Sequence, residues 1–380
     1  MTFWDDLTGQ ADAIQTLRAA ASADPANSSM THSWLITGPP GSGRSNLAYA
    51  FAGALLARGH DDEATARQVA ARSHPDLAVL STERIIITID EVRTLVASSQ
   101  FSPSVGRYRV VVIEDADRMT ERTSNLLLKA LEEPPPRTVW ILCAPSEADL
   151  IPTIRSRVRS VRLRVPSVVD VAALLERRGV DAPTALVAAR EAQSHIGMAQ
   201  RLATNPEARD RRRRTLETAL GIRSVSDAVI AASTMLAVAG DDAKAITEER
   251  DAEERASALR SLGVEPGGTV PPALRSQLRA LDDDQKRRAT RSLRDGIDRI
   301  MVDLLSLYRD VLLLHLGVGD DLVNESIRDQ VEQATRASSP ASTLAVMDAV
   351  SVARRRIESN VAPALALEAM LVAVSRHAVR

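Results

Sequence analysis

Two kinds of hydrophobic pattern divide this chain near residue 165. Before that point, apolar runs of four or five residues alternate with segments whose apolar positions recur every three or four residues, which predicts parallel strands alternating with helices. Beyond it, every apolar pattern has the helical period. The predicted strands span residues 34–37, 77–80, 109–113, 139–143 and 161–165.

Capping residues place several helix starts. Thr88 with Glu91, and again Ser167 with Asp170, have the spacing of a capping box, in which each residue's side chain accepts a hydrogen bond from the other's backbone N–H. A further helix is predicted over 125–133, and the three consecutive prolines that follow end it.

The patterns together predict an α/β domain with a parallel sheet, then a small helical lid, then an all-α domain. Charges of both signs are dense over 241–262, and two glycines and three prolines follow within 265–272, which indicates a solvated helical arm turned by a loop. We expect the three domains at 1–165, 166–208 and 209–380, with the charged arm at about 241–290.

Composition excludes several classes of protein. The chain has 380 residues and a net charge of −2, which disfavours a protein that wraps nucleic acid by bulk electrostatics. Its single cysteine, Cys143, lies in an apolar run, so disulfides are excluded and a buried, unreactive thiol is expected. The first residues lack the basic segment and apolar core of a secretory signal peptide, and no run of 18 apolar residues occurs. We therefore expect a cytoplasmic protein without membrane contact.

A phosphate-binding loop follows the first predicted strand. Its glycines allow backbone N–H groups to converge on phosphate oxygens at the start of a helix, and its last serine is placed to hold Mg²⁺. The residue before that serine is an arginine where lysine is usual, and a guanidinium fits the same cradle poorly, so hydrolysis is expected to be impaired. The loop consists of Gly38, Pro39, Pro40, Gly41, Ser42, Gly43, Arg44 and Ser45.

The second half of such a site is expected where the strand 109–113 is followed by Glu114 and Asp115. The usual order is an aspartate for the metal shell and then a glutamate that orients water, and here the order is reversed. Because catalytic geometry is sensitive to displacements of about 1 Å, the reversal also argues against hydrolysis. An ordinary turn and a solvated strand end are the alternative for either motif alone, but both in this order favour a P-loop fold.

These motifs resemble those of the AAA+ clamp-loader family, and in particular the δ′ subunits of bacterial DNA polymerase III clamp loaders. The resemblance is specific over residues 3–165, weaker across the lid and only architectural beyond 210. The strings that carry it are FWDDLTGQ at 3–10, HPD at 74–76, IDEVR at 89–93, NLLLKALEEPP at 125–135 and TIRSR at 153–157.

The resemblance implies a role for Ser156 and Arg157. In clamp loaders, the arginine of this pair enters the ATP site of the neighbouring subunit and stabilises charge on the transferred phosphate. Val158 stands where a cysteine usually follows, which leaves the guanidinium intact. The alternative is an arginine that is simply solvated beside Arg155 and Arg159.

Other positions depart from active relatives. Cys143 follows a strand where a polar sensor of the γ-phosphate is usual, and Gln200 stands where an arginine sensor is usual in the lid. No cysteine occurs over 58–73, where relatives often bind zinc, so no zinc or other metal site is expected. We interpret His60 and His74 as surface or turn residues.

Basic residues give a weak nucleic-acid signal. The run 211–214 consists of four arginines, which we interpret as a solvated helix start rather than a binding site. The family grips primer-template DNA inside a spiral of subunits, and Arg93 and Arg107 are the candidate contributors here.

The first functional hypothesis is a stator: an interaction protein on an ATPase fold that hydrolyses little or no ATP and donates Arg157 in trans. The resemblance implies γ/τ and δ subunits as partners in a hetero-pentamer, which engages the sliding clamp and primer-template DNA. Polymerase activity would belong to the whole assembly. No cofactor is then required, although ATP and Mg²⁺ stay open as ligands.

The second hypothesis is an active AAA+ motor, with Arg44 as the loop cation and Asp115 as the base. An unrelated P-loop kinase has no substrate signature in this sequence.

Overall fold

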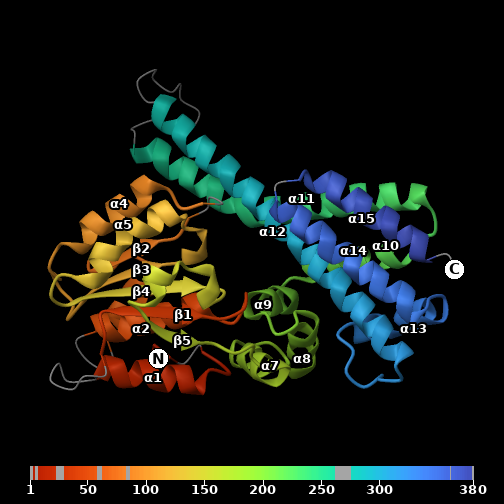
Figure 1. Ribbon diagram of the computed structural model, residues 1–380, viewed down its shortest axis with the longest axis horizontal. Coiled ribbons are helices and arrows are strands. Elements are labelled where there is room, and N and C mark those ends of the chain that lie inside the picture. Colours follow the sequence, from red (N-terminus) through yellow and green to blue (C-terminus); the bar gives the residue numbers. More distant parts are fainter. Residues whose placement is uncertain are drawn as a thin grey trace. The chain divides into compact units, whose positions relative to one another are not determined.

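The computed structural model describes residues 3–4, 7–22, 30–57, 62–82, 86–261, 275–359 and 361–378. The chain divides into two compact units, residues 1–204 and 205–380, and each is described by itself (Figure 1). The finer division into three domains stays a prediction. Asp5, Asp6, His60 and the expected turn at 265–272 lie outside the described residues.

A five-stranded parallel sheet forms the centre of the first unit, which confirms the α/β expectation (Figure 1). Its strands are β1 (Ser33–Thr37), β2 (Leu77–Leu80), β3 (Arg109–Ile113), β4 (Thr138–Ala144) and β5 (Arg159–Arg162). They lie in the order β2-β3-β4-β1-β5.

The last strand lies at 159–162, so the expected range of 161–165 was wrong in its bounds. Pairing with β1 begins at Arg159, on exposed polar residues that no hydrophobic pattern marks. Beyond the strand, the Gln10 side chain bonds both the N–H and the carbonyl of Arg164, at 3.1 and 2.8 Å.

Helices cover both faces of the sheet because alternate strand residues point to opposite sides. Trp34 and Ile36 of β1 join a core cluster with helices α1 and α2, whereas Leu35 joins a second cluster with α4 and α5 (Figure 1). The helices of this unit are α1 (Ala11–Ser22), α2 (Arg44–Leu56), α3 (Glu63–Ala70), α4 (Ile89–Ser99), α5 (Glu121–Glu132), α6 (Pro152–Arg155), α7 (Val168–Arg177), α8 (Ala182–Glu191) and α9 (Ile196–Thr204).

Both expected capping boxes are confirmed, at the starts of α4 and α7. Helix α5 begins one turn earlier than the expected range of 125–133, because Thr120 accepts a hydrogen bond from the Thr123 N–H and caps the helix there.

The second unit is helical around its own hydrophobic core, as expected. Its helices are α10 (Pro206–Leu220), α11 (Val225–Ser261), α12 (Arg275–His315), α13 (Arg328–Arg336), α14 (Pro340–Glu358) and α15 (Pro363–Ala378), with a 3-10 turn η4 (Glu325–Ile327). The apolar stripe of α12, including Ile297, Met301 and Leu304, packs in this core with Leu367 and Leu371 of α15.

Helices α11 and α12 have 37 and 41 residues and pair with each other over the expected charged arm (Figure 1). Across the pair, Arg288 contacts Asp251 at 2.7 Å and Glu254 at 2.9 Å. In the described ranges, none of the helices is long and apolar enough to span a membrane.

The expectation that the arginine run 211–214 is solvated holds for Arg213 and Arg214 but was wrong for Arg212. The run lies within α10, where Ala208, Arg212 and Leu216 share one buried face at helical spacing. Arg212 is only 8% exposed, whereas Arg213 is exposed.

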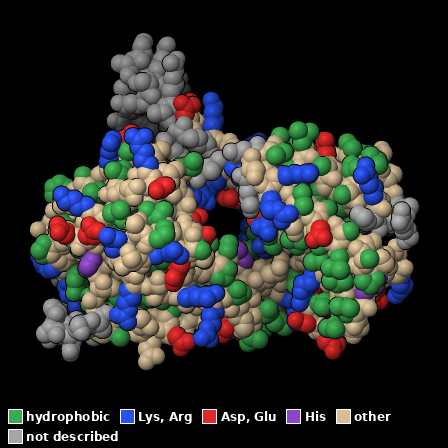
Figure 2. All heavy atoms as spheres, viewed as in Figure 1, with side chains coloured by type: hydrophobic (Ala, Val, Ile, Leu, Met, Phe, Trp, Pro, Cys, Tyr) green, Lys and Arg blue, Asp and Glu red, His purple; other side chains and the backbone are tan. Residues whose placement is uncertain are grey.

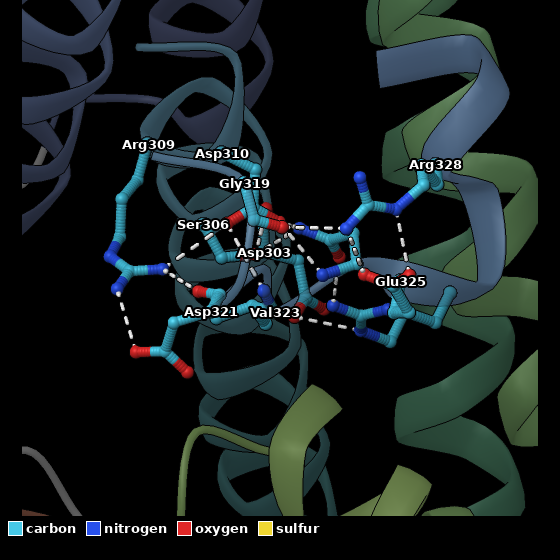
Figure 3. A network of polar contacts seen from close by, with 11 residues as sticks. Asp303, Ser306, Arg309, Asp310, Gly319, Asp321, Val323, Glu325 and Arg328 are labelled. Atoms are coloured by element: carbon cyan, nitrogen blue, oxygen red, sulfur yellow. Dashed lines mark hydrogen bonds and ion pairs between the residues drawn. The ribbon is translucent and has the colours of Figure 1, made fainter. Parts of the chain in front are cut away.

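Arg212 enters a buried polar network that Figure 3 shows around Asp303, Ser306 and Asp310 of α12. Its Nε donates to Asp303 at 3.1 Å, and a terminal nitrogen donates to the side-chain oxygen of Asn324 at 2.6 Å. Asn324 in turn donates its side-chain amide to Asp310 at 2.8 Å. The buried charge is therefore paired and hydrogen-bonded, as burial requires.

Candidate functional site

The expected phosphate-binding loop, at 38–45, lies between β1 and α2, in the strand, loop and helix order that such a loop requires. Gly41 and Gly43 have φ angles of 78° and 90°, left-handed values that residues with a side chain adopt at a cost. The N–H of Gly38 donates to the carbonyl of Pro145 at 3.2 Å, which joins the loop to the end of β4.

Arg44 folds back onto its own loop. One terminal nitrogen donates to the carbonyl oxygen of Gly38 at 2.6 Å. This charge-assisted hydrogen bond uses part of the guanidinium that would otherwise meet a phosphate. Ser42 is buried inside the loop, with its Oγ 2.7 Å from where a Cβ on Gly38 would stand.

The chain at 195–196, where α9 begins, packs directly on the loop. The N–H of Ile196 donates to the carbonyl of Gly41 at 3.2 Å. A Cβ on Gly41 would stand 2.3 Å from Cγ of His195, so only glycine fits beneath the imidazole. Gly41 therefore has a packing role that is independent of phosphate binding.

Glu114, directly after β3, has three side-chain partners. The Ser45 hydroxyl donates at 2.9 Å, the Tyr49 hydroxyl donates at 2.5 Å, and the Arg72 guanidinium lies 3.0 Å away. Arg72 also lies over the Tyr49 ring, 5.1 Å from its centroid. Burial, aided by the bond to Glu114, raises the pKa of Tyr49 far above its ordinary value, so this hydroxyl remains a donor.

The neighbouring acids are also engaged or buried. Asp115 has a left-handed φ of 51°, and its carboxylate lies 3.6 Å from Nε of Arg118. Burial raises the pKa of Asp117 above its ordinary value. Both candidate site acids, Glu114 and Asp115, are thus paired with arginines of their own chain.

The two expected sensor positions hold Cys143 and Gln200. Cys143 is buried at the end of β4, and burial raises the pKa of its thiol to about 12, which confirms the expected unreactive cysteine. Gln200 of α9 accepts a hydrogen bond from Arg178 at 3.3 Å, so its amide oxygen is directed toward the end of α7.

The fold is compatible with nucleotide binding, but the side chains in this arrangement do not fit a nucleotide with Mg²⁺. Mg²⁺ needs oxygen ligands in near-octahedral geometry, whereas the Glu114 carboxylate is shared among two hydroxyls and a guanidinium. Arg72 places at this carboxylate the positive charge that a metal would supply. In the part of the chain that is described, no three His, Cys, Asp or Glu side chains are grouped to hold a metal ion.

Arg157 lies near the surface between α6 and β5, with its side chain 32% exposed. Its Nε donates to Glu132 at 2.7 Å, and a second bond to the same carboxylate comes from a terminal nitrogen. The other terminal nitrogen donates to the Thr153 carbonyl at 2.7 Å and to the Ser156 hydroxyl at 3.1 Å. Ser156 and Arg157 therefore lie together, beside the edge strand β5.

Asp76 of the HPD string ties a loop to the sheet. It is buried and accepts hydrogen bonds from the backbone N–H groups of residues 104–106 at 2.6 to 2.7 Å. Burial alone would raise its pKa, but these bonds outweigh burial and lower the pKa to about 2. His74 lies in the same turn, buried rather than at the surface, and its Nδ1 accepts from the Asp76 N–H at 3.1 Å.

The two candidate DNA contacts lie in different settings, and their role stays a prediction. Arg93 is 65% exposed on α4, 3.5 Å from Asp90. Arg107 donates to the carbonyls of Ala21 and Ala54 at 3.3 and 3.0 Å, so it joins the ends of α1 and α2. On the face in Figure 2, basic and acidic side chains are interspersed.

Sequence reasoning missed four residues of these sites: Tyr49, Arg72, Glu132 and His195. A signal existed for Tyr49, because it follows Ser45 by four positions and so shares its face of α2. Arg72 had none, since it reaches Glu114 through a turn in which its own φ is 55°.

The first unit of the chain is similar to known proteins. The family model described as DNA polymerase III, delta subunit, matches residues 9–167. The DNA polymerase III subunit δ′ of Pseudomonas aeruginosa is 40% identical over 134 residues, which are 33% of this chain and 41% of that protein. The subunit δ′ of Escherichia coli K12 is 32% identical over 166 residues, 42% of this chain and 50% of that protein.

The chain thus spans about half or less of the length of these relatives. A crystal structure of a DNA polymerase III γ-subunit-related protein from Thermotoga maritima is 19% identical, with a TM-score of 0.44 over 97% of this chain and 100% of that one.

Proposed function

We propose that this chain, whose residues 9–167 match the family model described as DNA polymerase III, delta subunit, is a δ′-type subunit of a bacterial clamp loader. It hydrolyses little or no ATP and donates Arg157 to the ATP site of a neighbouring subunit. The observation that carries the proposal is a contrast between two arginines. Arg72 pairs with Glu114, an acid of the chain's own candidate nucleotide site, whereas Arg157 lies between α6 and β5, partly exposed and paired with Glu132.

The chemical contribution of Arg157 follows from its side chain. A guanidinium carries a fixed positive charge and a planar set of N–H donors that matches phosphate oxygens. Placed against a phosphoryl group in transfer, it stabilises the charge that develops there. The chain would in this way complete a catalytic site that it does not itself contain.

The proposed partners are the γ/τ and δ subunits, in a hetero-pentamer that engages the sliding clamp and primer-template DNA. The all-helical second unit is proposed to join the corresponding units of these partners in a collar. Polymerisation is then a property of the holoenzyme.

The test is the ATPase rate of a reconstituted loader with clamp and primed DNA. Arg157→Ala is expected to lower the rate ~10-fold or more, because the neighbour's site loses its trans charge. Arg155→Ala, an exposed arginine two positions away, is the matched control and should change little. An unchanged rate in an intact Arg157→Ala assembly would refute the trans role.

The second candidate is an active AAA+ motor. A motor requires the Ser45 hydroxyl and the Glu114 carboxylate close together around a metal ion, and they are 2.9 Å apart, but Arg72 would first have to leave Glu114. Single-turnover ATP hydrolysis by the isolated chain separates the candidates: the δ′-type proposal expects none, and a motor expects a clear burst of product.

A further inference from the structure

The guanidinium of Arg157 is almost fully engaged within its own chain. An arginine has five N–H donors. Two of them bond one carboxylate oxygen of Glu132, and two more bond the Thr153 carbonyl and the Ser156 hydroxyl. The side chain therefore has a set direction, fixed from the end of α5 and from α6.

Glu132 is suited to hold the Arg157 side chain in place. It is the last residue of α5, and three prolines follow at 134–136, so the backbone on both sides is constrained. Among the described residues its ion pair is with Arg157, and its side chain is 46% exposed. The neighbouring Glu133 is also exposed and makes no ion pair in the described part of the chain.

A carboxylate at this place could either withhold the arginine from a phosphate or hold it ready for one, and magnitudes decide between the two. An ion pair between side chains 32% and 46% exposed shifts an equilibrium by a factor of about two to five. An arginine acting in trans on phosphoryl transfer contributes roughly 10³ to 10⁵ in rate. So weak a pair cannot withhold the guanidinium, but it does restrict a side chain with many rotamers before the phosphate arrives.

We propose that Glu132 is a positioning residue, which directs the Arg157 guanidinium toward the nucleotide of the neighbouring subunit. This inference rests on the proposed trans role of Arg157. Glu132 touches no nucleotide and acts only through the arginine. The Thr153 acceptor is a backbone carbonyl and the Ser156 hydroxyl accepts one bond at 3.1 Å, so Glu132 is the charged support that a substitution can remove.

The experiment measures kcat and the KM for ATP of the reconstituted loader with clamp and primed DNA. Glu132→Ala is expected to lower kcat roughly two- to fivefold without changing KM, because the orientation that the ion pair provides is lost and no ATP contact is lost. Glu132→Gln should fall between Glu132→Ala and the unchanged chain, since its amide oxygen still accepts a hydrogen bond. Glu133→Gln, the matched control, should leave both constants unchanged.

Arg157→Ala in the same assay distinguishes failure of the positioning role from failure of the proposed function. If Arg157→Ala lowers kcat and both Glu132 variants keep it, the positioning role is wrong while the proposed function stands. If Arg157→Ala has no effect, the trans role is wrong and the positioning role falls with it. A rise in kcat for Glu132→Ala would show competition with the phosphate and would also overturn the inference.

A double variant tests whether the two residues act as one unit. On the Arg157→Ala background, Glu132→Ala should cause no further loss of kcat. A further loss as large as in the parent chain would mean that Glu132 acts through folding or assembly, which contradicts a positioning role.

Discussion

At the scale of single residues, Asp76 shows how one buried carboxylate secures a loop. Its oxygens satisfy three backbone N–H groups of residues 104–106 and the hydroxyl of Ser104. Groups buried in this way are costly to leave without an acceptor. The HPD string therefore has a structural explanation that needs no ligand.

Asp76→Asn is expected to lower the free energy of unfolding of the first unit by about 2 kcal/mol at pH 7, because an amide replaces the charged acceptor. Since folding lowers the pKa of Asp76 from 3.8 to about 2, its stabilisation is complete above pH 3.8 and is lost as the pH falls toward about 2. Urea unfolding across this range should therefore show the difference between the two proteins closing.

The exposed Glu176→Gln on α7 is the control, with an expected change below about 0.5 kcal/mol. A gap between wild type and Asp76→Asn that persists down to pH 2 would show that the carboxylate charge is not what stabilises the loop.

Local motifs made part of the site predictable. The loop 38–45 and the acids after β3 could be placed because strand, glycine turn and helix follow one another in sequence. The contacts that change their chemistry could not. Arg72 reaches Glu114 only through the tertiary fold, and His195 meets Gly41 from a helix start far along the chain.

At the scale of elements, α10 shows why a run of like charges is a poor guide to exposure. A helix turns each successive residue by about 100°, so four adjacent arginines point in different directions. Arg212 falls on the apolar face and Arg213 outside it. Ala208 and Leu216 lie four residues before and after Arg212, so helical spacing places Arg212 on their buried face. The run of four arginines drew attention away from this spacing.

Arg212→Ala is expected to destabilise the second unit by about 3 kcal/mol, because the buried Asp303 keeps only the longer contact with Arg299, at 3.9 Å, and the side-chain oxygen of Asn324 loses the Arg212 donor. Arg213→Ala, which removes a 58% exposed side chain, should cost less than about 1 kcal/mol. Chemical unfolding of both variants gives the comparison, and equal losses would contradict the buried network.

Strand and helix positions followed well from periodicity and caps, except at β5. An edge strand with exposed Arg159, Ser160 and Arg162 has little hydrophobic signal. Its position depends on pairing with β1, which only the folded sheet supplies.

At the scale of the whole molecule, the described hydrophobic clusters segregate by unit. Two clusters lie within residues 1–204 and one lies within 205–380. The change of pattern near residue 165 predicted an α/β part and a helical part, which is the observed fold class. The expected start of the helical domain at 209 lies near the observed boundary between the two compact units, at 204 and 205.

Separate cores imply separable unfolding. In calorimetry, Asp76→Asn should lower the midpoint temperature of one unfolding transition and Arg212→Ala that of the other, because each removes contacts from a different unit. If either substitution displaces both transitions equally, the two units unfold as a single cooperative block.

The buried thiol of Cys143 makes this chain convenient for site-specific chemistry. It is 2% exposed and its pKa is raised to about 12, so at neutral pH it is almost entirely an unreactive thiol. A cysteine introduced at the exposed position of Glu133 would then be the one site that a maleimide dye reaches, with the native cysteine left in place. A fluorophore there, next to the Glu132–Arg157 pair, would test in real time whether the proposed neighbouring subunit binds beside that arginine.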